Sequence, residues 1–336
     1  MSSRQNHTLK SCKIRVGITI GDPCGIGPAI TLEAVRRLKG LAGFVVVGDS
    51  YVLDRASIAL GRKLTQLKHR PTMFETVDLR NVERNNFKFG KLRADYGRAS
   101  VEYLDKALEL LKRKEIDCLV TAPVSKEAIN LSGIKFSGHT EYLAQRSGTK
   151  DFAMMLLNDK LRFCLVTRHV PLKDVSRLLT KDKLYGVVFM ACKSLRELFC
   201  IKRPRLVVCG LNPHASDNGV IGAEENRIIK PALGLLRRRL HACIDGPLAS
   251  DAAIYKAREK KYDCVIAMYH DQALIALKLS GFETGVNMTL GLPFVRTSCL
   301  HGTAFDIAGN PQSANPASLI AAIKLAVKCS SNLKNA

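Results

Sequence analysis

The stretch from Met268 to Gly309 gathers side chains whose types could do chemistry. It reads MYHDQALIALKLSGFETGVNMTLGLPFVRTSCLHGTAFDIAG. A His-Asp pair, a Lys, an Asn, an Arg and a second His lie between short apolar runs and glycines. Such side chains, held on strand ends and glycine turns, suit the recognition of a small anionic ligand. We therefore expect the rest of the chain to be organised around this stretch.

Three histidines, His169, His214 and His270, each follow a separate apolar strand-like run. The carboxyl ends of parallel strands meet at one edge of a sheet, where open α/β folds bind their ligands. Three imidazoles at that edge could form an open metal site with positions left for substrate oxygen. Each histidine could equally be structural or solvated, because their spacing matches no metal motif. Both interpretations stay open on spacing alone.

Two further segments could hold an anion. The turn GDPCGIGP (21–28) separates a strand from a helix, and its glycines could let backbone N–H groups approach a phosphate. It could equally be a tight strand-to-helix turn, since it is neither a Walker loop nor a GxGxxG fingerprint. In the second segment, His139 and Thr140 open a helix. The Thr140 hydroxyl could cap that helix or help its N-terminus to hold an anion.

Strand-like and helix-like segments alternate between these motifs. Buried β-branched runs occur at 43–48, 116–120, 205–209 and 263–268, and the segment 96–114 has apolar residues at helical spacing. This alternation predicts an α/β fold with mostly parallel sheets and helices on their faces. A chain of 336 residues exceeds what one core usually supports, so we expect two α/β/α domains around a central cleft.

The net charge of +22 raises the possibility of a nucleic-acid partner. The basic clusters at 112–114, 237–239 and 256–261, however, lie in or after expected surface helices. There is no Trp, and no aromatic residues alternate with these charges to stack bases. We therefore expect a solvated basic surface and no nucleic-acid partner.

No apolar run is long enough to span a membrane, and the N-terminus lacks the apolar core of a signal peptide. The 11 cysteines contain no CxxC pair and show no regular framework. Several of them lie within strand-like runs, where Cys behaves as a small hydrophobic residue. This pattern is typical of reduced thiols, so we expect a cytoplasmic protein that does not contact a membrane.

Six ordered motifs resemble the 4-hydroxythreonine-4-phosphate dehydrogenase family of vitamin B6 biosynthesis. They are GDPCGIGP, FSGHTE, TRHVPL, GLNPHA, MYHDQ and GVNMTLGLPFVRTS followed by HGTA. The resemblance extends from about Val16 to Ala326. The segment HGTAFDIAGNPQSANP also looks like that of isopropylmalate dehydrogenases, which have the wider fold. Those relatives suggest a first domain of residues 12–125 plus 301–332 and a second domain of residues 126–300.

The resemblance implies an NAD-dependent oxidation of 4-phosphooxy-L-threonine, followed by decarboxylation to 3-amino-2-oxopropyl phosphate. NADP is possible as the cofactor. The family is a homodimer with one divalent metal per site, shared between the subunits and held here by His169, His214 and His270. Neutral imidazoles suit Zn or Co better than Mg, although substrate oxygens would make Mg acceptable. The resemblance places substrate contacts at His139, Thr140, Lys278, Asn287 and Arg296.

The proton acceptor for the alcohol is open between Asp251 and Asp271, since Asp271 could instead orient His270. For NAD, the relatives suggest Gly302, Thr303 and Asp306, with Asp306 accepting a ribose hydroxyl. Asp306 could equally be a cap or turn residue.

The chain departs from the family pattern at five positions around the expected site: Ala29, Ser216, Ala249, Ala273 and Leu300. None of these removes an expected ligand or substrate contact, but they bear on substrate choice. One alternative is a related dehydrogenase acting on D-threonate or D-erythronate 4-phosphate. A second, of another class, is a non-catalytic basic relative that binds RNA or a protein.

Overall fold

One sheet of 11 strands runs through the described part of the chain. The computed structural model describes residues 14–62 and 74–335. The strand order is β3-β2-β1-β4-β11-β10-β5-β6-β9-β7-β8. The strands are β1 (Arg15–Thr19), β2 (Gly43–Gly48), β3 (Glu75–Asp78), β4 (Cys118–Thr121), β5 (Ala153–Leu157), β6 (Arg162–Leu165), β7 (Arg205–Cys209), β8 (Cys243–Leu248), β9 (Cys264–Ala267), β10 (Val286–Leu290) and β11 (Val295–Cys299).

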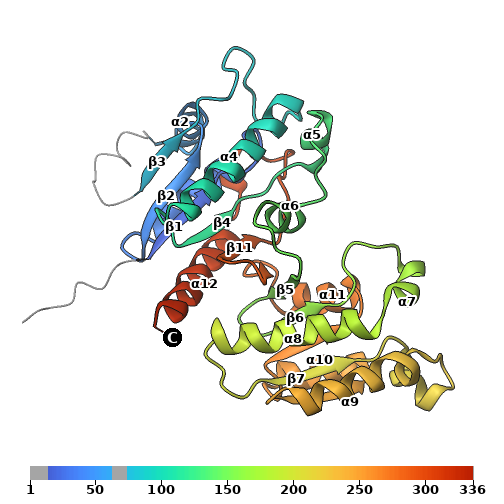
Figure 1. Ribbon diagram of the computed structural model, residues 1–336. Coiled ribbons are helices and arrows are strands. Elements are labelled where there is room, and N and C mark those ends of the chain that lie inside the picture. The colour runs from blue at the N-terminus through green and yellow to red at the C-terminus, as the bar shows by residue number, and fades with distance from the viewer. Residues whose placement is uncertain (1–13, 63–73, 336) are drawn as a thin grey trace, which may run out of the picture.

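The sheet has two parallel halves joined by an antiparallel centre. Strands β3, β2, β1, β4 and β11 pair in parallel, and so do β6, β9, β7 and β8. Between the halves, β10 runs antiparallel to β11 and β5, and β5 runs antiparallel to β6. This arrangement confirms the α/β class with mostly parallel pairing. In Figure 1 the two halves form an upper and a lower lobe, and the predicted domain boundaries remain a prediction.

Helices cover both faces of the sheet. They are α1 (Gly27–Arg37), α2 (Ser50–Ala59), α4 (Ala94–Lys112), α5 (Lys126–Leu131), α6 (His139–Arg146), α7 (Val175–Leu178), α8 (Lys181–Glu197), α9 (Lys230–Arg239), α10 (Ser250–Arg258), α11 (His270–Gly281) and α12 (Ala317–Lys334). Alternate residues of β6 point to opposite faces. Accordingly Cys164 packs in the cluster that contains α8, whereas Phe163 packs in the one that contains α10 and α11.

The turn 21–28 is held by hydrogen bonds within the turn and to the backbone of Pro123 and Thr303. The N–H groups of Asp22, Gly25 and Ile26 donate to backbone oxygens, and that of Cys24 donates to the Asp22 carboxylate. Gly21 has a φ of +73°, and an added Cβ would lie 2.1 Å from the Pro123 oxygen, so only glycine fits. Because these four N–H groups already have partners, the structure favours the tight turn over the phosphate cradle.

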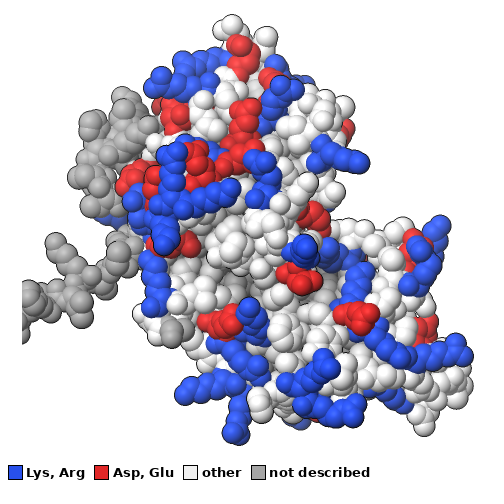
Figure 2. Space-filling model, viewed as in Figure 1, with Lys and Arg blue, Asp and Glu red and all other residues white. Residues whose placement is uncertain are grey.

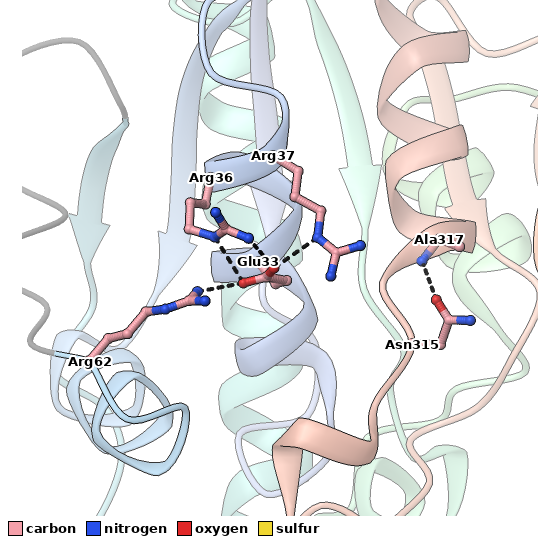
Figure 3. A network of polar contacts seen from close by, with 6 residues as sticks. All are labelled: Glu33, Arg36, Arg37, Arg62, Asn315 and Ala317. Atoms are coloured by element: carbon pink, nitrogen blue, oxygen red, sulfur yellow. Dashed lines mark hydrogen bonds and ion pairs between the residues drawn. The ribbon is translucent and has the colours of Figure 1, made fainter.

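A carboxylate on α1 holds three arginines together. Glu33 pairs with Arg36 at 2.5 Å, with Arg37 at 2.8 Å and with Arg62 at 2.5 Å (Figure 3). The hydrogen bonds from these arginines, that of Arg36 foremost, lower the pKa of Glu33 well below its ordinary value of 4.5. This network joins the end of α1 to the segment after α2. At the right of Figure 3, Asn315 accepts the Ala317 N–H where α12 begins.

Glu33→Gln is expected to lower the free energy of unfolding by about 1–2 kcal/mol, because the arginines are partly exposed and screened. Because the pKa of Glu33 is lower in the folded state than in the unfolded state, its carboxylate stabilises the fold. This contribution is complete at pH values above the unfolded-state pKa, which is near 4.5. Its contribution is lost as the pH falls further toward the folded pKa. Urea unfolding at pH 7 and pH 3.5 checks this: the difference in stability between the two proteins should be smaller at pH 3.5, and part of it should remain because the folded pKa lies below 3.5. Glu109→Gln, which removes more exposed pairs on α4, should cost clearly less.

The basic side chains are spread over the molecule. The clusters at 112–114, 237–239 and 256–261 lie at the carboxyl ends of α4, α9 and α10, as predicted, where positive charge complements the helix dipole. On the face shown in Figure 2, Lys and Arg occur on both lobes and are interleaved with acidic residues on the upper one. No helix within the described ranges is long and apolar enough to cross a membrane.

Candidate functional site

The three histidines follow neighbouring parallel strands. His169 follows β6, His270 follows β9 and His214 follows β7, and these strands lie side by side in the order β6-β9-β7. The prediction that their carboxyl ends meet at one sheet edge is therefore confirmed. The His169 and His270 rings lie 5.4 Å apart between centroids.

Side chains lock these strand ends together. The Thr167 hydroxyl donates to the Met268 oxygen at 2.7 Å, which joins the ends of β6 and β9. The Gln272 amide accepts from Met268 N at 2.6 Å and donates to the Gly210 oxygen at 2.9 Å. Gln272 thus connects β9 to the loop that carries His214. No sequence pattern marks Gln272 as a positioning residue.

The chemistry of the two paired imidazoles fits a metal. His270 Nδ1 lies 2.7 Å from an Asp271 oxygen, and a carboxylate at this distance favours the tautomer with the proton on Nδ1. That tautomer leaves the Nε2 lone pair for a ligand. Burial, and then the positive charge of Lys126, lower the pKa of His169, which favours its neutral form. In one chain, residues 14–62 and 74–335 contain no group of three His, Cys, Asp or Glu placed to hold a metal.

The loop that carries His214 has an unusual backbone. Residues 214–218 all have positive φ, and none of them is glycine. A buried carboxylate supports this loop: Glu225 accepts the N–H groups of Leu211 and Asn212 at 2.8 Å each, and the Asn212 amide at 2.9 Å. The side chain of His214 itself is exposed. Strained non-glycine backbone of this kind persists where surrounding contacts fix it, and Glu225 fixes the two residues, Leu211 and Asn212, that lead into it.

Glu225→Gln is expected to reduce kcat/KM by about 10- to 100-fold, as for other groups that orient ligands. The substitution places an NH2 group against N–H donors and so disturbs the loop before His214. Steady-state kinetics, together with titration of a divalent metal against a chelator, would measure the effect. Glu224→Gln is the matched control, because Glu224 accepts the Asn212 side-chain amide but neither backbone N–H of Leu211 and Asn212, and should have a smaller effect. Equal effects of the two substitutions would contradict a positioning role for Glu225.

A second polar cluster lies inside the sheet at its centre. Arg296, 1% exposed, donates to the Thr121 hydroxyl at 2.7 Å and to the Thr289 hydroxyl at 3.0 Å. The Thr289 and Thr140 hydroxyls lie 3.2 Å apart. Burial lowers the pKa of Arg296 to about 10. Thr140 faces this cluster, and Gly138 is the N-cap of α6, so Thr140 is not the helix cap.

Three buried polar atoms of this region have no partner within the described residues. They are His139 Nε2, Asn287 Oδ1 and Arg296 Nε. Burial, and then the charge of Arg296, lower the pKa of His139 well below 6.5, so its ring is neutral. Buried polar atoms normally find hydrogen-bond partners. These three unpartnered atoms all belong to residues predicted to contact the substrate. A bound ligand would therefore supply the hydrogen-bond partners that they lack.

Other predicted residues stand apart from this cluster in a single chain. Lys278 is exposed on α11, with its ammonium 5.4 Å from the Phe282 ring centroid. Within the described ranges, no hydrogen bond or ion pair joins Lys278 to Arg296. Asp251 and Asp271 are both exposed, and Asp271 is engaged with His270. The contact at Asp271 agrees with the orienting role.

The predicted cofactor residues follow β11 and face the turn 21–28. The Thr303 oxygen accepts the Ile26 N–H at 3.0 Å, and an added Cβ on Gly25 would lie 3.0 Å from that oxygen. Gly302 and Asp306 are exposed. The loop is therefore held close to the turn at the end of β1, while its role toward NAD remains a prediction.

A cavity of about 1200 Å³ opens beside His169. It is lined by Lys126, Glu141, Arg168 and His169, and by residues of α8 such as Tyr185 and Lys193. This hollow adjoins both the paired imidazoles and the start of α6.

The departures from the family pattern fall on well-packed positions. Ala29, Ser216 and Ala273 are buried, Ala249 precedes α10, and Leu300 packs on Gly285. The Ser216 hydroxyl is buried and has no partner in the described structure. These positions touch the surroundings of the expected site and leave its predicted contact residues in place.

Comparison with known proteins identifies the family. The family model described as pyridoxal phosphate biosynthetic protein PdxA matches residues 41–326. The 4-hydroxythreonine-4-phosphate dehydrogenase of Sulfurihydrogenibium sp. (strain YO3AOP1) is 43% identical over 319 residues, covering 94% of this chain and 98% of the relative. That of Desulfosudis oleivorans is 40% identical over 326 residues, covering 93% and 95%. The solved Klebsiella pneumoniae structure with that name has a TM-score of 0.85 at 35% identity, covering 96% of this chain and 99% of its own.

The α/β fold and these matches define a dehydrogenase. The chain belongs to the PdxA family of 4-hydroxythreonine-4-phosphate dehydrogenases, which confirms the resemblance found in the sequence.

Proposed function

We propose that this enzyme oxidises 4-phosphooxy-L-threonine with NAD, with NADP as the possible substitute. The observation that carries the proposal is that one cation, Lys126, lies within electrostatic reach both of His139, beside the buried Arg296 cluster, and of His169, in the His169–His270 pair. The cluster offers fixed donors to an anion, and the imidazole pair offers lone pairs to a divalent cation. A phosphorylated hydroxy amino acid needs both.

In the proposed reaction the C3 alcohol loses its proton to a base and its hydride to the nicotinamide. The resulting β-keto acid breaks its C2–C1 bond and releases CO₂. The electron pair stays on C2, which is then protonated to give 3-amino-2-oxopropyl phosphate. Arg296, His139, Thr140 and Asn287 orient the substrate, and Lys278 is proposed to reach it from the partner subunit.

A divalent ion, Zn, Co or Mg, would be held by His169, His270 and His214, with the set completed across a homodimer. When bound, it supplies Lewis acidity to the alcohol oxygen. Asp271 holds the His270 ring, so we propose Asp251 as the base. Gly302, Thr303 and Asp306 are proposed to bind the dinucleotide.

The homodimer is supported by an apolar face on α11. Ile275, Leu279 and Phe282 are 62%, 84% and 55% exposed. Exposed apolar side chains grouped in this way mark interaction surfaces. A second copy of this chain would cover them and bring its own site residues near. We place the enzyme in the cytoplasm, which the unbonded state of the described cysteines supports.

The test is NAD reduction by metal-supplemented protein, with 4-phosphooxy-L-threonine and D-threonate 4-phosphate side by side. Turnover of the first with release of CO₂ supports the proposed function. Preference for the second would assign the enzyme to the related activity. Failure to reduce NAD or NADP with either substrate and any of the three metals would overturn the proposal.

A further inference from the structure

One lysine between the two clusters has no role in the function described so far. Lys126 is the first residue of α5, a short step along the chain from Thr121, which binds Arg296. Its ammonium lies 3.6 Å from the position that a Cβ on Gly138 would occupy. Gly138 is the N-cap of α6 and directly precedes His139. Lys126 therefore stands at the start of the helix that carries two predicted substrate contacts.

The Lys126 side chain also lies near His169, one of the two paired imidazoles. Lys126 and His169 line the same cavity, together with Glu141 and Arg168. The positive charge of Lys126 also contributes, after burial and Arg296, to lowering the pKa of His139. The ammonium thus lies within electrostatic reach of both His139 and His169.

The charges around it are unbalanced. Glu141 pairs with Arg168 at 3.6 Å through one carboxylate oxygen, and its other oxygen lies 3.0 Å from the same Gly138 Cβ position. In residues 14–62 and 74–335, the Lys126 ammonium makes no ion pair or hydrogen bond, and no carboxylate pairs with Arg296. Two cations are left for an external anion, and the N-terminus of α6 adds its own partial positive charge. His139 Nε2, buried and without a partner, points to a ligand at this place independently of the charges.

We propose that the Lys126 ammonium binds the phosphate of the substrate at the N-terminus of α6. This inference rests on the proposed function for the identity of the phosphate ester. Lysine suits the role because it acts as a point charge toward phosphate, whereas Arg296 is fixed below by two threonine hydroxyls. The site then meets a phosphate dianion with two cations, a helix N-terminus and a neutral imidazole.

The test compares Lys126→Met with the wild type in two ways. Titration calorimetry with inorganic phosphate measures anion binding without any turnover, and the Kd is expected to rise about 10- to 100-fold, the loss typical of one charge-assisted hydrogen bond. Kinetics with 4-phosphooxy-L-threonine should show a similar fall in kcat/KM, mainly through KM. Lys126→Arg keeps the charge and should restore phosphate binding to within a few-fold, which also shows that the site remains folded.

Lys193→Met is the control, because Lys193 lines the same cavity from α8, a helix that carries no predicted substrate contact. It should leave the phosphate Kd within about twofold, since only diffuse electrostatics would act from there. An unchanged Kd for Lys126→Met, or an equal loss for Lys193→Met, would overturn the inference. If Lys126→Met raises the KM but leaves phosphate binding intact, Lys126 contacts the carboxylate and the inference is wrong. If the wild type does not turn over 4-phosphooxy-L-threonine, the proposed function fails, and the phosphate titration still decides the role of Lys126.

Discussion

His270→Ala is expected to remove bound divalent metal and to lower kcat/KM at least about 1000-fold, or about 4 kcal/mol in activation free energy. The imidazole that it removes is the one whose orientation the structure defines best. Its Nδ1 contacts Asp271, and its ring lies beside that of His169. With one of two facing imidazoles gone, too few neutral nitrogen donors remain to hold the ion.

Metal content after dialysis and NAD reduction with 4-phosphooxy-L-threonine check this expectation together. Asp271→Asn should be milder, about 10- to 100-fold, because it disturbs the orientation of the ring and keeps the donor. His241→Ala is the matched control, since His241 is exposed and follows α9, away from the site. Retention of stoichiometric metal by His270→Ala would show that His270 is not a ligand.

The convergence of the strand ends that precede the three histidines could be predicted because it depends on local patterns alone. Each histidine follows an apolar run, and parallel strands place their carboxyl ends at one edge. The order β6-β9-β7 confirmed this expectation. The alternation of strands and helices likewise predicted the α/β class. Such features need no knowledge of which strand lies beside which.

What the sequence could not show are the contacts between distant segments. Arg296 binds Thr121, and Thr140 meets Thr289, although the members of each pair are far apart in the chain. Thr289 could have been found, because it is two residues from Asn287 on the same strand face. Glu225 resembles any acidic residue near a helix start. Its burial against the Leu211 and Asn212 N–H groups makes it a positioning residue.

The junction of the two lobes was also beyond the sequence patterns. Residues 286–290 and 295–299 form antiparallel β10 and β11, and β11 joins β4 of the upper lobe. Part of a stretch that was expected to hold its side chains on strand ends and glycine turns thus forms the centre of the sheet. This placement buries Arg296, whereas an arginine on a loop would be solvated. The sequence shows that residue 296 is an arginine. Its burial depends on the pairing of β11 with β4 and β10, which local sequence patterns do not reveal.

Arg296→Met is expected to lower kcat/KM about 100- to 1000-fold, about 3–4 kcal/mol, while leaving the free energy of unfolding close to that of the wild type. The two effects separate because the guanidinium is buried without a carboxylate partner in the described residues. Its desolvation costs about as much as its hydrogen bonds to Thr121 and Thr289 contribute. A bound anion would supply the missing counter-charge. The free energy lost by desolvating the Arg296 guanidinium is therefore offset only when the anion is bound.

Urea unfolding with and without inorganic phosphate distinguishes this role from a structural one. Phosphate should stabilise the wild type and have little effect on Arg296→Met. Arg296→Lys keeps the positive charge, but an ammonium lacks the planar guanidinium that donates to both threonine hydroxyls. Its activity should therefore lie between that of the wild type and that of Arg296→Met. Arg162→Met, which removes an arginine from β6 that binds the Asp263 oxygen, should keep the response to phosphate. A large loss of stability in Arg296→Met with the phosphate response preserved would mean that Arg296 holds the sheet together, and that the anion binds elsewhere.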